Sequence, residues 1–102
     1  MRIIKDSRIG EFAKQYSRAS SSLKIWRTST RGADWKSFED VRKTFRSADQ
    51  MTLPGGYRIV VFNIGGGAFR LVTAIHYNRG IVYIRKFLTH AQYSKEDWKN
   101  DP

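Results

Sequence analysis

The spacing of apolar residues changes near the middle of this 102-residue chain. In the first half they recur every three or four positions, which is the period of a helix with one buried face. From Tyr57 onward they run in short β-rich stretches that are separated by glycine-containing turns. Helices followed by consecutive strands predict an α+β fold, in which the N-terminal helices pack on one face of a small antiparallel sheet.

Three helices are expected in the first half, after a short strand. The strand is assigned to residues 1–4, and the helices to residues 9–16, 20–32 and 35–45. Two of these helices have candidate side-chain caps. Asp6 or Ser7 would accept a free backbone N–H of the first helix, and Ser37 with Asp40 would form a capping box on the third.

The second half is expected to form a meander and a short C-terminal helix. The strands are assigned to residues 57–64, 68–77 and 81–88, and the helix to residues 95–99. Glycine-containing turns would join the strands as hairpins, with Asn63 as a turn former. The stretch 47–56 is expected to be a loop. Ser94 would cap the last helix, Asp97 would complete its box and Trp98 would pack back onto the fold.

The charge of the chain points to a polyanionic partner. Lys and Arg number 19 against 9 Asp and Glu, a formal net charge of +10. Such a surface attracts polyanions through phosphate contacts and counterion release. The basic residues run through the whole chain and are interleaved with aromatic residues, which favours nucleic acid over a lipid-binding amphipathic helix.

Several other kinds of chemistry are disfavoured. The chain has no cysteine, and its two histidines, His76 and His90, have no clustered carboxylates, so neither thiolate chemistry nor a metal site is expected. The glycine run 65–67 precedes a strand, unlike a phosphate-binding loop. No apolar run approaches the roughly 20 residues that span a membrane, and the polar start does not fit a signal peptide. A single cytoplasmic domain over residues 1–102 is therefore expected.

A basic, metal-free site suits RNA, because the 2′-hydroxyl of RNA is itself a nucleophile. Cleavage then needs a base, cations for the transition state and an acid. The C-terminal half offers suitable side chains: Arg70, Arg85, Lys86, His90 and Tyr93. With a two-residue turn at 79–80, one face of the sheet would carry Arg70, Val72, Ala74, His76, Tyr83, Arg85 and Phe87. Each type also occurs at ordinary solvated or packed positions, so the prediction depends on their clustering.

Three motifs resemble the HigB toxins of the RelE superfamily. They are VFNIGG at 61–66, an aromatic-Arg-Leu at 69–71 and IR-x-x-x-T-H-x-x-Y at 84–93. The segment around Trp35, Phe38 and Val41-Arg42 is also similar. The resemblance covers most of the chain. It implies a RelE-like fold and a toxin that cleaves mRNA, typically on the translating ribosome.

The resemblance also implies roles for individual residues. Arg70 would stabilise the scissile phosphate, His90 would be the acid or the base, and Tyr93 would position or exchange a proton. The identity of the general base stays open between His90, Tyr93 and a lysine. Arg85 would act with Lys86 in holding the RNA backbone. Further phosphate or ribosomal-RNA contacts would come from Lys36, Arg42, Lys43 and Arg46.

The implied partner is a HigA-type antitoxin with a helix-turn-helix domain, and operator DNA would be bound only through it. No cofactor is implied. Two alternatives share the same composition. A non-catalytic RNA-binding module would keep its effect without His90, whereas an inactive toxin homologue would act only through the antitoxin and would not be toxic.

Overall fold

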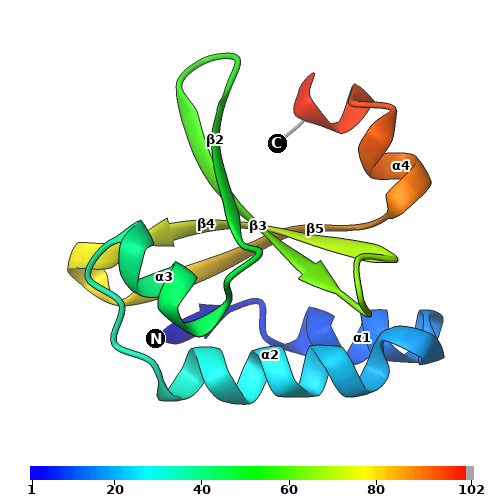
Figure 1. The fold of residues 1–102 in the computed structure, drawn as a ribbon, viewed down its shortest axis with the longest axis horizontal. Coiled ribbons are helices and arrows are strands. Elements are labelled where there is room, and N and C mark those ends of the chain that lie inside the picture. The colour runs from blue at the N-terminus through cyan, green and yellow to red at the C-terminus, as the bar shows by residue number, and fades with distance from the viewer. Residues whose placement is uncertain (101–102) are drawn as a thin grey trace.

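The computed structural model describes residues 1–100 and shows a five-stranded sheet with the N-terminal helices on one face (Figure 1). The helices are α1 (Ser7–Gln15), α2 (Ser20–Gly32), α3 (Phe38–Thr44) and α4 (His90–Ser94), with short 3₁₀ helices η1 (Ser17–Ala19), η2 (Tyr77–Arg79) and η3 (Asp97–Asn100). The strands are β1 (Arg2–Ile4), β2 (Asp49–Leu53), β3 (Tyr57–Ile64), β4 (Phe69–His76) and β5 (Ile81–Thr89). In Figure 1, α1 and α2 lie along one face, while the β2–β3 hairpin and the C-terminal segment rise from the other. The α+β prediction is confirmed.

The strands stand in the order β1-β5-β4-β3-β2. The meander of β3, β4 and β5 is confirmed, but the stretch 47–56 is not simply a loop. Its strand β2 pairs antiparallel with β3, with Asp49 opposite Val61. The sequence concealed β2 because Leu53 is its only buried residue. Strand β1 joins β5 in parallel, so the sheet is mixed where an antiparallel one was expected.

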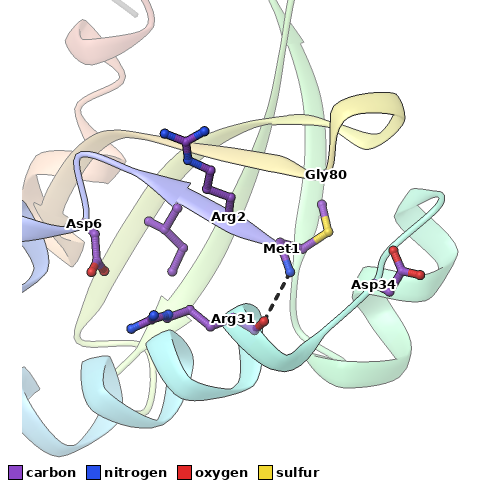
Figure 2. Close-up of a pocket in the computed structure, with 7 residues that line it drawn as sticks. Met1, Arg2, Asp6, Arg31, Asp34 and Gly80 are labelled. Atoms are coloured by element: carbon purple, nitrogen blue, oxygen red, sulfur yellow. Dashed lines mark hydrogen bonds between the residues drawn. The ribbon is translucent and has the colours of Figure 1, made fainter.

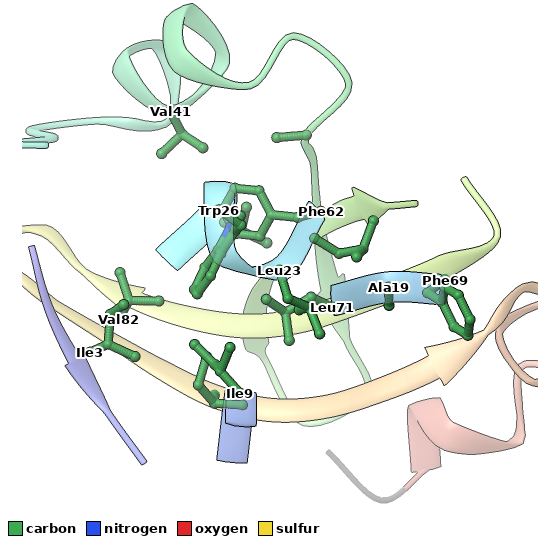
Figure 3. Packing of buried hydrophobic residues seen from close by; sticks show 14 of the residues in the cluster. Ile3, Ile9, Ala19, Leu23, Trp26, Val41, Phe62, Phe69, Leu71 and Val82 are labelled. Atoms are coloured by element: carbon green, nitrogen blue, oxygen red, sulfur yellow. The ribbon is translucent and has the colours of Figure 1, made fainter. Parts of the chain in front are cut away.

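The main core lies between the helices and the sheet (Figure 3). Phe62 of β3 contacts three other rings: its centroid lies 5.3 Å from Trp26, 6.2 Å from Trp35 and 5.3 Å from Phe45. These rings come from α2 and from the segments that flank α3. Burial of such large rings is the main favourable contribution to folding here, because the stabilisation scales with the apolar area removed from water.

A second, smaller core lies on the opposite face of the sheet. Trp98 of η3 packs there with Leu53, Ile59, Val61 and Val72. The N-terminal helices leave this face of the sheet uncovered, but it is only partly open to a ligand, because Trp98 packs on it. All three tryptophans, Trp26, Trp35 and Trp98, are buried.

Two predicted helix caps do not form, because both carboxylates bond to other donors. Asp6 precedes α1, but its oxygens accept hydrogen bonds from Arg27 Nε (2.8 Å) and Nη2 (2.7 Å) on α2. Ser37 makes no side-chain cap on α3, and the Asp40 carboxylate accepts the backbone N–H of Lys36 at 2.9 Å. The Asp6–Arg27 pair thus joins α1 to α2.

This ion pair predicts a dependence of stability on pH. The hydrogen bonds from Arg27 lower the pKa of Asp6 in the folded chain, against an opposing effect of burial. The pair therefore stabilises the fold above the unfolded-state pKa of about 4, and this contribution is lost as the pH falls through the folded-state pKa. Asp6→Asn should lower the free energy of unfolding by less than about 1 kcal/mol at neutral pH, because both side chains are about one-third exposed or more.

Urea denaturation of the wild type and of Asp6→Asn at about pH 7 and pH 2 tests this effect. The difference between the two proteins should vanish at the lower pH. An equal difference at both pH values would contradict it. Asp34→Asn is the matched control, because Asp34 is exposed in its pair with Lys36.

Candidate active site

Arg70 stands at the start of β4, next to the glycine turn that joins β3 to β4. Its Nη1 donates to the carbonyl oxygens of Gly67 and, at 3.3 Å, Phe69. Gly67 has a φ of +95°, which favours glycine strongly. The predicted hairpin turn is confirmed, and its backbone also orients the guanidinium of Arg70.

His90 is the first residue of α4, directly after β5, and its side chain lies next to that of Arg70. Thr89 caps this helix in a reciprocal box with Gln92, and the His90 N–H donates to the carbonyl of Ala68 at 2.9 Å. The imidazole Nδ1 lies 3.5 Å from Arg70 Nη2. The side chain is otherwise exposed, so a substrate can approach it.

The cap at Thr89 starts the C-terminal helix earlier than predicted. Ser94 ends α4 and does not cap a helix over 95–99; its hydroxyl donates to the His90 carbonyl at 2.9 Å. Asp97 begins the 3₁₀ turn η3 and is not the acid of a capping box. The packing of Trp98 back onto the fold is confirmed.

Tyr93 completes the cluster one turn into α4. Its ring centroid lies 5.3 Å from the guanidinium carbon of Arg70 and stacks on Trp98 at 5.1 Å. The indole N–H of Trp98 donates to the Tyr93 carbonyl at 2.9 Å. Burial raises the pKa of the Tyr93 phenol, and Asp49 adds to the shift. The shift favours the protonated phenol, whose hydroxyl can donate a hydrogen bond.

A pocket of about 330 Å³ opens beside Arg70 and Tyr93, and His90 is not among the residues that line it. Its lining residues are Arg42, Ser47, Ala48, Asp49, Val61, Asn63, Arg70 and Tyr93. Sequence reasoning pointed to Arg42, Arg70 and Tyr93 but assigned Asn63 to a turn, whereas Asn63 lies in β3 directly opposite Arg70. Its place in the VFNIGG motif was the available signal. Asp49 was missed because its strand was expected to be a loop.

The predicted pairing of β4 with β5 is wrong in register. His76, not Asn78, stands opposite Ile81, because the connection includes the turn η2. A β-bulge then interrupts the ladder: Thr73 pairs with Ile84, but Val72 pairs with Lys86.

The bulge changes which β5 residues share a face with Arg70. Leu88 stands opposite Arg70, and Lys86 lies on the same face. Phe87, which was expected there, packs on the helix side, 4.9 Å from Phe12 and 5.3 Å from Phe69 between ring centroids.

The four predicted cations around α3 do not act as one group. Arg42 lines the pocket and donates from Nη2 to the Arg46 carbonyl at 3.0 Å. Lys36 and Lys43 lie 3.1 Å and 3.8 Å from aspartate oxygens of their own segment. The pocket lining includes none of Lys36, Lys43 and Arg46.

A larger pocket, of about 510 Å³, lies beside β1 (Figure 2). Its charged side chains have both signs: Arg2, Arg31, Asp6 and Asp34 all line it. The amino nitrogen of Met1 donates to the Arg31 carbonyl at 3.4 Å. None of the predicted site residues lines it, so the cluster around Arg70 is the candidate active site.

Residues 1–100 contain neither a metal-binding cluster nor a membrane-spanning helix. No three His, Cys, Asp or Glu side chains are grouped so that they could hold a metal ion. Within the same residues, no helix has the length and apolar character needed to cross a bilayer.

The fold and the basic cluster fit the class of small toxins found in toxin–antitoxin systems. A scan against protein-family models matches residues 19–96 to the HigB toxins, described as the RelE-like toxic component of a toxin–antitoxin system. The chain belongs to this HigB toxin family, and an antitoxin is its partner. The resemblance seen in the three sequence motifs and the expected RelE-like fold are confirmed. A search of curated proteins found no match.

Proposed function

We propose that this toxin is an endoribonuclease that cleaves mRNA and thereby stops translation. The observation that carries the proposal is the convergence of His90 and Tyr93 on Arg70, which lines a pocket together with Tyr93. Arg70 Nη2 and His90 Nδ1 are 3.5 Å apart, so both can reach one phosphate group. The net charge of +10 supports a polyanionic substrate.

In the proposed reaction, His90 accepts the proton of the 2′-hydroxyl next to the scissile phosphate. The 2′-oxygen attacks phosphorus, which forms a 2′,3′-cyclic phosphate and breaks the bond to the 5′-oxygen. Arg70 stabilises the negative charge that develops on the phosphate oxygens. Tyr93, which its raised pKa keeps protonated, donates a proton to the leaving 5′-oxygen. The reaction needs neither a metal ion nor a cofactor.

The remaining predicted cations would hold RNA outside the reacting group. Arg85 and Lys86 would contact the substrate backbone from β5, and Arg42 would do so at the pocket. Lys36, Lys43 and Arg46 would contact ribosomal RNA. We further propose a single domain over 1–102 that acts in the cytoplasm on the translating ribosome. A HigA-type helix-turn-helix antitoxin would neutralise the toxin, and the toxin would bind operator DNA only through this antitoxin.

A modified substrate tests this chemistry. Primer extension on a translated reporter mRNA first maps the cut site. Two oligoribonucleotides with the sequence around this site are then incubated with the toxin and ribosomes. One is unmodified, and the copy has one 2′-deoxy residue at the cut site. The copy should stay intact, because it lacks the nucleophile. Cleavage of the copy at the same bond would refute the proposed mechanism, and absence of any cut would refute the proposed function.

Trp98 is expected to act as a positioning residue for Tyr93. Trp98→Ala removes the ring that stacks on Tyr93 and shields it from water. The pKa of Tyr93 should fall toward that of an ordinary phenol, and the cleavage rate should drop by at least about tenfold because the phenol is no longer held in place.

Carbon-13 NMR of labelled tyrosine measures the pKa of Tyr93 in this variant. Trp98→Phe is the matched variant, because it keeps an aromatic ring but loses the hydrogen bond to the Tyr93 carbonyl; its rate should be intermediate. A Tyr93 pKa unchanged in Trp98→Ala would show that Trp98 does not position the phenol.

A further inference from the structure

A third pocket, of about 230 Å³, opens on the same sheet face as Arg70. Its lining residues are Tyr57, Arg58, Ile59, Ala74, His76, Tyr83 and Arg85. Tyr57 is 56% exposed, which is unusual for so large a ring in this chain. We name this site the Tyr57 pocket.

The Tyr57 pocket has an apolar floor and aromatic sides. Ile59 is buried, and Ala74 stands opposite Tyr83 between β4 and β5. The rings of His76 and Tyr83 meet edge to face, with centroids 5.1 Å apart and planes at 67°. A flat aromatic group fits such a cavity by stacking.

Cations accompany these rings, as they do in sites for single-stranded RNA. Arg58 and Arg85 line the pocket together with Tyr57. Proteins that hold unpaired RNA combine exposed aromatic rings, which stack on bases, with arginine or lysine for the phosphates. The lining of the Tyr57 pocket therefore favours a nucleobase with its phosphate over an uncharged apolar ligand.

The geometry of the sheet connects this pocket with the candidate active site. Alternate residues of β4 share a face, so Ala74 lies on the face of Arg70, four residues or about 13 Å along the strand. Trp98 covers the β3 side of that face, where it packs on Ile59 and Val61. The route along β5 passes the bulge, where Arg85 lines the Tyr57 pocket and the next residue, Lys86, pairs with Val72 on the face of Arg70.

We propose that the Tyr57 pocket binds an unpaired nucleobase of the RNA strand, a few nucleotides from the scissile phosphate, with the intervening backbone along β5. The inference rests on the proposed function and adds a substrate subsite to it. It assigns binding roles to Tyr57, His76 and Tyr83, which the cleavage chemistry does not use.

Binding of non-cleavable RNA tests the subsite separately from cleavage. Three RNA probes each carry a 2′-deoxy residue at the mapped cut site. One probe has three nucleotides, and the other two have eight nucleotides, extended to the 5′ side in one and to the 3′ side in the other. One extension should tighten binding to the wild type roughly tenfold, as expected for a stacked base. Tyr57→Ala and His76→Ala should each remove most of that gain, and Tyr57→Phe should keep it. Ile25→Ala, an exposed apolar position on α2, is the control.

The fluorescence of 2-aminopurine at successive positions of the longer probe then locates the base. Stacking in the pocket should quench one position in the wild type and not in Tyr57→Ala. Equal affinity of the wild type for all three probes would overturn the subsite, as would retention of the gain in both alanine variants. Because cleavage is measured in a separate assay, either result leaves the proposed nuclease intact, whereas failure to cut any mRNA counts against the nuclease itself.

Discussion

Replacing His90 with alanine should lower the rate of RNA cleavage by about 10²- to 10⁴-fold, the usual contribution of a general acid or base. The fold should persist, because the backbone and not the imidazole of His90 bonds to Ala68, and Thr89 still caps α4. Single-turnover cleavage of the mapped RNA measures the loss. Inducible expression of both proteins, with primer extension on a reporter mRNA, measures its effect in cells.

The neighbouring variant Ala91→Ser is the control for His90→Ala, because Ala91 is exposed on the same helix. It should cut RNA and arrest growth like the wild type. If the wild type and His90→Ala both arrest growth without cutting RNA, the chain acts as an RNA-binding module. If neither is toxic, the chain is an inactive homologue that acts through its antitoxin. Full cleavage by His90→Ala would exclude His90 as the base.

Replacing Phe62 with alanine should cost about 3–5 kcal/mol of unfolding free energy, a large part of the 5–15 kcal/mol typical of a domain. Phe62 is 1% exposed and contacts Trp26, Trp35 and Phe45, so its loss leaves a cavity among three rigid rings. The surrounding rings cannot all move inward to fill it. Urea denaturation, followed by tryptophan fluorescence, measures the change.

The cost should depend on volume and burial. Phe62→Leu should lose less stability than Phe62→Ala, because leucine fills more of the space. Ile25→Ala, at a position that is 64% exposed, should change stability by no more than about 0.5 kcal/mol. A loss below about 1 kcal/mol in Phe62→Ala would show that the aromatic cluster does not hold α2 and α3 on the sheet.

Periodicity predicted the elements that pack an apolar face against the main core. Val41 is buried in α3, and the glycine turns at 65–67 and 78–80 separate β3, β4 and β5 as expected. Strand β2 escaped prediction because four of its five residues are not buried and it depends on backbone pairing with β3. Strand β1 was expected, but nothing local indicates that it lies parallel to β5.

The candidate site was predicted through a motif and not through geometry. Arg70, His90 and Tyr93 do converge, but the register used to group Arg70 with Phe87 was wrong. A β-bulge has no dependable sequence signal, because it reflects how two strands share twist and packing. The place of Asn63 in the pocket lining was likewise not predicted, because the sequence did not show that Asn63 pairs with Arg70 across the hairpin.

Local sequence was thus sufficient for the N-terminal helices, the β3–β4–β5 meander and the positive charge, because each depends on short-range spacing or on composition. The tertiary structure was needed for the sheet order, the bulge on β5, the Asp6–Arg27 pair and the stacking of Trp98 on Tyr93. These features join residues that are distant in the chain or depend on one strand register among several. Their free energy comes from contacts that exist only after the helices have packed on the sheet.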